Sequence, residues 1–224
     1  GSKGNLALIG MAILTLLNNG EFDREKCKYL HIFGVSSNEA MVYIQFIQRM
    51  LNRQDIDIQL TYDSTYWNRT CVFGGYFIRE QYIIGTGMES MNWPNTIDYA
   101  KLGKDFKLPC WCPICEDLED GYSFFNTFRK NKNGEEKLSF VKFNMMVGFH
   151  NLFLQMIYNK MTNRLLKADM PEVYKEAFSP KVYKNLRLLE TVFSKPKNGD
   201  NYQILQQVFN KRKHETETAN ALDV

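Results

Sequence analysis

Apolar and polar positions along the first part of the chain predict short strands. Residues 6–9 form an apolar run that ends at Gly10, and residues 29–35 form a second run. Over residues 56–62 apolar and polar side chains alternate, as they do in a strand with one buried face. We therefore expect three strands before Asp63.

Helical spacing predicts a helix between the second and third of these strands. Residues 38–52 carry a stripe of apolar side chains, and Ser37 directly before them can cap the free amides of a first turn. The positions expected to face the core are Ala40, Tyr43, Ile44, Ile47 and Leu51. Strands that alternate with helices predict parallel βα units, in which ligands bind at the carboxyl ends of the strands.

The pattern changes near Trp67. Residues 67–108 are rich in glycine and aromatic side chains, which favours irregular structure and short hairpins. Beyond residue 115 the chain is expected to be mainly helical, with Pro171 and Pro180 in the first turns of two helices. The other predicted helices cover about 118–128, 138–166 and 201–211, and residues 214–224 are expected to form a disordered tail.

Composition places the chain among ordinary globular proteins. With 44% hydrophobic, 14% aromatic and 24% charged residues, it differs from disordered, collagen-like and disulfide-scaffold chains. No apolar run approaches the roughly 20 residues of a membrane-spanning helix, so we expect no membrane association and an intracellular location. A formal net charge of +3 is compatible with nucleic-acid binding but does not argue for it.

Three of the five cysteines form a closely spaced group. Cys110, Cys112 and Cys115 follow a Cys-x-Cys-x2-Cys pattern, which favours a metal site over a disulfide framework. Zn²⁺ binds thiolates in tetrahedral sites and would need a fourth ligand. His150 is the best candidate because it lies on the inward side of the long predicted helix, whereas His31 lies in a strand.

Four protein ligands would leave no open position on the ion. We therefore expect a structural Zn²⁺ that holds the cysteine loop against the long helix. The alternative for His150 is a core histidine whose nitrogens are satisfied by hydrogen bonds. Cys27 and Cys71 have no neighbours that suggest a nucleophile and are expected to be thiols without a bridge.

The cysteine motif after Pro109, followed by His150-Asn151-Leu152 on a helix, resembles the zinc subdomain of the tRNA-guanine transglycosylases. Three upstream segments resemble that family in the same order. Residues 7–11 resemble its base-binding loop, residues 29–35 its next strand, and residues 62–64 the strand end with the nucleophilic aspartate.

The resemblance covers about residues 6–165 and has two departures. Ile9 stands where the family usually has another glycine, which affects the detail of base recognition. The gap between Cys115 and His150 is longer than the family pattern, and residues 130–137 read as an insertion in it.

The fold implied by the resemblance is α/β, the carboxy-terminal part of a (β/α)8 TIM-type barrel with an inserted zinc-binding subdomain and carboxy-terminal helices. The implied divisions are 1–66 for the last βα units, 67–166 for the zinc-binding subdomain and long helix, 167–213 for the carboxy-terminal helices and 214–224 for the tail. A complete barrel takes about 250 residues. The Gly1-Ser2 start also reads as the scar of a proteolytic cleavage. We therefore expect that the other strands belong to a missing segment or to a partner chain, and that this chain is inactive alone.

The activity implied by the resemblance is that of a pentosyltransferase that exchanges guanine in a nucleic acid for a 7-deazaguanine. Asp63 would be the nucleophile, and no residue here matches the family's second aspartate. The implied substrate-binding residues are Phe33, which would stack on the base, Gly10 and Met11, whose amides would bind it, Arg69, which would hold a phosphate, and Gly34 and Ser64. In the alternative, Asp63 caps a turn, Phe33 is core and Arg69 is a surface charge.

Two substrates are compatible with the resemblance. The Thr61-Tyr62-Asp63-Ser64 context favours the phage and bacterial relatives that modify DNA, with tRNA as the alternative. For such a protein we expect a cytoplasmic location (the host cytoplasm for a phage gene) and a homodimer or a partner chain. Two further hypotheses are a non-catalytic subunit that binds nucleic acid and a purely structural zinc protein.

Overall fold

The computed structural model describes residues 6–23, 25, 27–35, 37–72, 75–77, 90–92, 110–116 and 140–209. The chain divides into two compact units. The first, which we call the sheet unit, contains residues 1–64, 83–86 and 162–224, and the second, the cysteine unit, contains residues 65–82 and 87–161. Each unit is described by itself.

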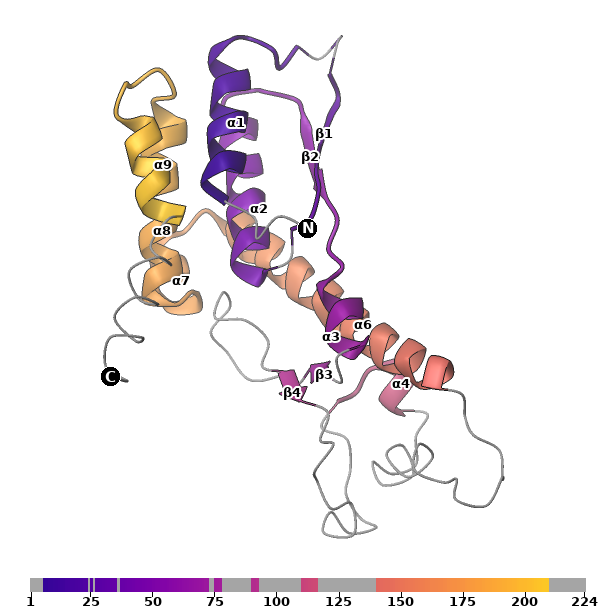
Figure 1. Cartoon of the computed structure of the whole chain (residues 1–224). Helices are drawn as coiled ribbons and strands as arrows, with labels where there is room; N and C mark the ends of the chain where they lie inside the picture. Colours follow the sequence, from indigo (N-terminus) through magenta and orange to yellow (C-terminus); the bar gives the residue numbers. More distant parts are fainter. Residues whose placement is uncertain are drawn as a thin grey trace, which may run out of the picture. The chain divides into compact units, whose positions relative to one another are not determined.

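The sheet unit contains one parallel strand pair. β1 (Tyr29–Ile32) pairs with β2 (Gln59–Tyr62) over four residues, from Tyr29 opposite Gln59 to Ile32 opposite Tyr62. The helix α2 (Asn38–Asn52) connects the strands and packs on β2 (Figure 1). The predicted parallel βα arrangement is therefore confirmed for this one unit.

The first turn and the buried face of α2 agree with the sequence-based prediction. The Ser37 hydroxyl accepts a hydrogen bond from the amide of Ala40 at 3.1 Å and caps the first turn. All five residues of the predicted apolar stripe are buried. At the centre of this face the Tyr43 hydroxyl accepts a hydrogen bond at 2.8 Å from the side-chain amide of Asn185, which binds α2 to the carboxy-terminal helices.

The predicted strand over residues 6–9 is wrong. These residues begin the helix α1 (Leu6–Asn18), which ends shortly before Gly20 with its positive φ of 69°. The apolar run continues past Gly10 without a proline, so it is long enough for a helix that buries Ile13 and Leu14. α1 packs on α9 (Asn201–Phe209), and the side-chain amide of Asn18 donates to the carbonyl of Pro196 at 3.0 Å.

The carboxy-terminal helices belong to the sheet unit. α7 (Pro171–Ala177) and α8 (Pro180–Ser194) each begin with the expected proline, and α8 packs on both α2 and α9. Asp169, between α6 and α7, adopts a positive φ of 58° and binds Arg49 of α2 at 2.6 Å and also Arg53. Within the predicted segment 167–213, α8 thus packs on α2, and α9 packs on the helix α1.

The cysteine unit is built from short elements around a long helix, α6 (Phe140–Ala168), which continues into the sheet unit from residue 162. α3 (Tyr66–Val72) was not predicted, because Trp67 was assigned to irregular structure. β3 (Gly75–Phe77) and β4 (Ser90–Asn92) form the expected type of antiparallel pair, and α4 (Pro113–Glu116) carries the third cysteine. The predicted helix over 118–128, the insertion 130–137 and the tail 214–224 lie outside the described residues.

The described part of the chain is mainly helical, with one parallel and one antiparallel strand pair. The interpretation as part of a (β/α)8 barrel stays a prediction. Among the described helices, none combines the length and the apolar character that crossing a membrane requires.

Candidate functional site

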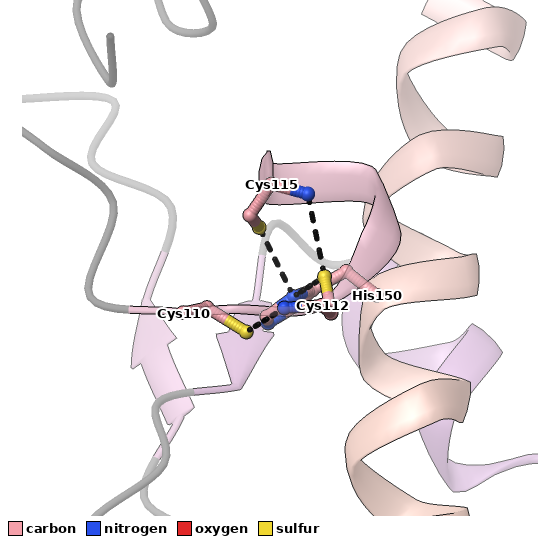
Figure 2. A group of neighbouring side chains, drawn as sticks. All are labelled: Cys110, Cys112, Cys115 and His150. Carbon is pink, nitrogen blue, oxygen red and sulfur yellow. Dashed lines mark hydrogen bonds between the residues drawn. The ribbon is translucent and has the colours of Figure 1, made fainter. Parts of the chain in front are cut away.

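Four side chains of the cysteine unit converge on one point. Cys110, Cys112, Cys115 and His150 each offer one ligand atom, and these atoms all lie within 4.8 Å of one another. Figure 2 shows the three thiols around one edge of the His150 ring, with Cys115 on α4, Cys110 and Cys112 shortly before this helix, and the histidine on α6. All of them except Cys110 are buried. The predicted ligand set is therefore brought together.

The cysteine segment turns tightly because of its own sequence. Pro113 begins α4, so Cys112 takes the capping position and its carbonyl accepts the amide of Cys115 at 2.9 Å. Two backbone amides donate to sulfur atoms at 3.4 Å, from Cys112 to the Cys110 thiol and from Cys115 to the Cys112 thiol. Amides that donate to sulfur stabilise thiolates, the form that binds metals.

Hydrogen bonding fixes which nitrogen of His150 faces the thiols. The Nε2 atom lies 2.8 Å from the carbonyl oxygen of Phe77, and a carbonyl can only accept, so Nε2 carries the proton. In the neutral ring Nδ1 then presents a lone pair, at 3.2 Å from the sulfur of Cys112 and 3.4 Å from that of Cys115. The core-histidine alternative accounts for Nε2, and in it Nδ1 would be hydrogen-bonded to the cysteine sulfur atoms.

The distances fit one tetrahedral ion. A Zn²⁺ ion with bonds of about 2.3 Å to sulfur and about 2.0 Å to nitrogen would separate those two ligand atoms by about 3.5 Å. The observed separations from Nδ1 are 3.2 and 3.4 Å, so an ion could enter after movements of a few tenths of an ångström. The group can therefore hold a metal ion, and four protein ligands would close its coordination shell.

The same contacts shift the ionisation of the ligands in the absence of a metal. Hydrogen bonds from Cys110 and then Cys115 lower the pKa of the Cys112 thiol far below its usual range, although burial alone would raise it. Burial lowers the pKa of His150, but hydrogen bonds to Cys110, Cys112 and the Phe77 carbonyl outweigh it and raise the value to about 9. These contacts thus favour a thiolate beside an imidazolium, and a metal ion that bound here would replace the proton.

Aromatic residues pack around this centre. The ring of Trp111 meets that of Phe153 edge to face, with 5.4 Å between ring centroids. On α6, a side chain at Gly148 would lie 3.3 Å from the Trp67 ring and 3.4 Å from the sulfur of Cys71, so α3 packs closely on a helix position without a side chain. Cys71 is buried, and its thiol donates to the carbonyl of Asn68.

In the sheet unit, Asp63 ties together the carboxyl ends of the two parallel strands. Its Oδ1 atom accepts a hydrogen bond from the amide of Gly34 at 2.6 Å, and its carbonyl accepts one from Val35 at 3.1 Å. The carboxylate is exposed to solvent. The predicted position at a strand end is confirmed, and the hydrogen bond also fits the alternative in which Asp63 caps a turn.

Phe33 directly precedes Gly34 and is 76% exposed, so the alternative in which it is a core residue is wrong. Its ring meets that of His31 edge to face at 4.5 Å, and Nδ1 of His31 is hydrogen-bonded to the Thr61 hydroxyl at 2.9 Å. His31 was considered only as a metal ligand, but its ring, on β1, meets that of Phe33 just beyond the end of the strand. Ser64 follows Asp63 and is partly buried.

The other predicted substrate contacts fare differently. Gly10 and Met11 lie inside α1, where backbone amides are used by the helix, so the predicted base-binding loop is not present there. The apolar residues of this segment favour a helix over a loop because α1 packs on α9. Arg69 is exposed on α3 of the cysteine unit.

Comparisons of the chain with protein-family models, with curated proteins and with solved structures found no match in any of the three sets.

Proposed function

We propose that this chain takes part in base exchange in a nucleic acid, with Asp63 as the nucleophile and DNA as the favoured substrate. The observation that carries the proposal is an exposed carboxylate at the carboxyl end of β2, held beside the end of β1 by the amide of Gly34. This edge is where parallel βα units bind ligands. The resemblance to the tRNA-guanine transglycosylases supplies the reaction class.

The reaction would run in two displacements at the sugar. A carboxylate oxygen of Asp63 forms a bond to C1′ while the bond from C1′ to guanine breaks and its electron pair leaves with guanine, which takes up a proton. The incoming 7-deazaguanine gives up a proton from its ring nitrogen, attacks C1′ and releases the carboxylate. Protons balance between the two bases, and the acid and base that carry them have no assigned residue.

The exposed ring of Phe33 would support the base during this exchange. Stacking on an aromatic ring contributes about 1–3 kcal/mol per base and tolerates different bases. The target nucleotide must first leave its stack, which costs least in a loop or a single strand. Gly34 and Ser64 flank the proposed site.

Zn²⁺ is the ion that we propose for the cysteine unit. Three thiolates and one imidazole form a soft donor set that Zn²⁺ occupies in closed tetrahedral sites, and in such a site the ion contributes folding energy instead of catalysis. Cys110, Cys112, Cys115 and His150 would hold it and thereby fix α4 against α6.

The proposal is tested with the full-length gene product. It is incubated with labelled 7-deazaguanine and either duplex DNA or tRNA, and covalent protein–nucleic acid adducts are resolved by denaturing electrophoresis. We expect incorporation into DNA and an adduct that Asp63→Ala abolishes, whereas Asp57→Ala, at an exposed position shortly before β2, preserves both. Incorporation into tRNA alone would refute the DNA assignment, and unchanged activity of Asp63→Ala would refute the mechanism.

A non-catalytic nucleic-acid-binding subunit is the second candidate. It is favoured by the hydrogen bond between Asp63 and Gly34, because capping a strand end is a structural task for a carboxylate. For this candidate, Asp63→Asn should bind nucleic acid as well as the unaltered protein, and neither should form an adduct.

A further inference from the structure

Asn151 is a buried polar residue that neither the metal site nor the proposed reaction uses. It follows His150 on α6, and both side chains are 0% exposed. A buried side-chain amide requires partners for its acceptor and its donors. Asn151 finds them on two different elements of the cysteine unit.

Asn151 makes one hydrogen bond to β3 and one to α3. Its Oδ1 atom accepts the amide of Phe77 on β3 at 2.8 Å, and its Nδ2 atom donates to the carbonyl of Trp67 on α3 at 3.2 Å. Since an N–H can only donate and a carbonyl can only accept, the orientation of the amide group is fixed.

Phe77 is therefore held at both of its backbone groups by consecutive residues of α6. Its carbonyl accepts the Nε2 proton of His150, and its amide donates to Asn151. The carbonyl is the group that leaves Nδ1 of His150 available to a metal. A metal-bound histidine commonly depends on such a partner for its tautomer and ring orientation.

We propose that Asn151 is a positioning residue of the metal centre. It holds the Phe77 peptide so that the carbonyl directs Nδ1 of His150 toward the cysteines, and it connects this arrangement to α3 through Trp67. Ion binding at the cysteines and the order of α3 are thereby coupled through one side chain. The inference rests on the metal centre and is independent of the base-exchange reaction.

The chemistry of asparagine suits both tasks. Aspartate keeps an acceptor for the Phe77 amide but has no donor for the Trp67 carbonyl, and alanine has neither. Loss of a partner that orients a metal ligand typically weakens metal binding about 10–100-fold. Gly148 on the same helix face allows Trp67 to approach α6 closely, which the hydrogen bond from Asn151 requires.

The test measures Co²⁺ affinity of the full chain by competition with a chelator. Asn151→Ala should lower the affinity about 10–100-fold and Asn151→Asp less, whereas Asn163→Ala, at an exposed position of the same helix, should leave it unchanged. In the Cd²⁺-loaded protein, heteronuclear NMR should identify Nδ1 of His150 as the ligand nitrogen. Hydrogen exchange of the α3 amides should slow on metal binding in the unaltered protein and much less in Asn151→Asp.

A purely structural Asn151 predicts a different result. Both variants would then lose thermal stability equally with and without metal, and their Co²⁺ affinity and α3 exchange would match those of the unaltered protein. That outcome, coordination through Nε2, or an unaltered chain that binds no metal would each overturn the proposal. If Asn151→Ala does not fold, the Co²⁺ affinity and α3 exchange of Asn151→Asp are compared with those of the unaltered protein instead.

Discussion

The carboxylate of Asp63 and the backbone amide of Gly34 are joined by a hydrogen bond of 2.6 Å between the ends of two parallel strands. The Asp63 side chain thus has a structural partner in the Gly34 amide. Because the side chain is also exposed, it can contact a ligand. The two tasks can be separated experimentally, since only one of them requires a charged nucleophile.

Replacement of Asp63 should distinguish stability from chemistry. Asp63→Asn keeps an acceptor for the Gly34 amide, so we expect the free energy of unfolding to change little, while Asp63→Ala should lose about 1 kcal/mol. Both should abolish the covalent adduct. Urea unfolding followed by circular dichroism provides the measurement, and a larger loss in Asp63→Asn than in Asp63→Ala would contradict the assigned hydrogen bond.

Metal affinity should rise with pH. Without metal the pKa of His150 is raised to about 9, so at lower pH the ion must displace a proton from this ring. We expect the apparent affinity to fall about tenfold for each pH unit below that value, because one proton must leave the His150 ring for each ion that binds. Zinc titration against a chelator between about pH 6 and 8 checks this, and a flat profile would show that His150 is not a ligand.

The junction after α6 depends on Asp169. Its positive φ of 58° disfavours a side chain with Cβ by about 1–2 kcal/mol, and its carboxylate binds Arg49 and Arg53. Asp169→Ala loses the ion pairs and keeps the strain, whereas Asp169→Gly loses the ion pairs and relieves it. We therefore expect Asp169→Ala to have the lower melting temperature, and the reverse order would contradict the account.

Close packing at Gly148 predicts an unusual response to larger residues. Alanine in a helix normally gains about 1 kcal/mol over glycine, but its Cβ would lie 3.3 Å from the Trp67 ring. We expect Gly148→Ala to gain less than that and Gly148→Val to lose about 1–3 kcal/mol through overpacking. Gly199→Ala, in the turn before α9, is the control for the contact alone, since no atom lies within 4 Å of its Cβ position. Chemical unfolding with Trp fluorescence would reject the packing argument if Gly148→Val were neutral.

Short-range signals made α2 and the metal ligands predictable from the sequence. Ser37, the spacing of the apolar stripe and the first-turn prolines act within a few residues, and three cysteines in six positions leave few interpretations. The segment from Leu6 was misassigned because a short apolar run suits a strand or a helix equally. What decided it was packing against α9, almost two hundred residues later, which local patterns do not contain.

Asn151 illustrates the same limit within the site. Its residue type and its place beside His150 were visible, but its partners on α3 and β3 depend on how distant segments meet. A polar residue next to a predicted ligand on the inward side of a helix is the sequence signal that could have found it. For Phe77 no such signal exists, because its contribution comes from the backbone alone.

The central claim is that Cys110, Cys112, Cys115 and His150 bind one metal ion in a closed shell. X-ray absorption at the zinc edge of the purified protein tests it most directly, with elemental analysis for the stoichiometry. The account predicts one Zn²⁺ per chain, with three sulfur ligands at about 2.3 Å and one nitrogen at about 2.0 Å, and no change in Cys27→Ser. A substoichiometric metal content, or a shell that includes water oxygen or a fourth sulfur, would contradict it.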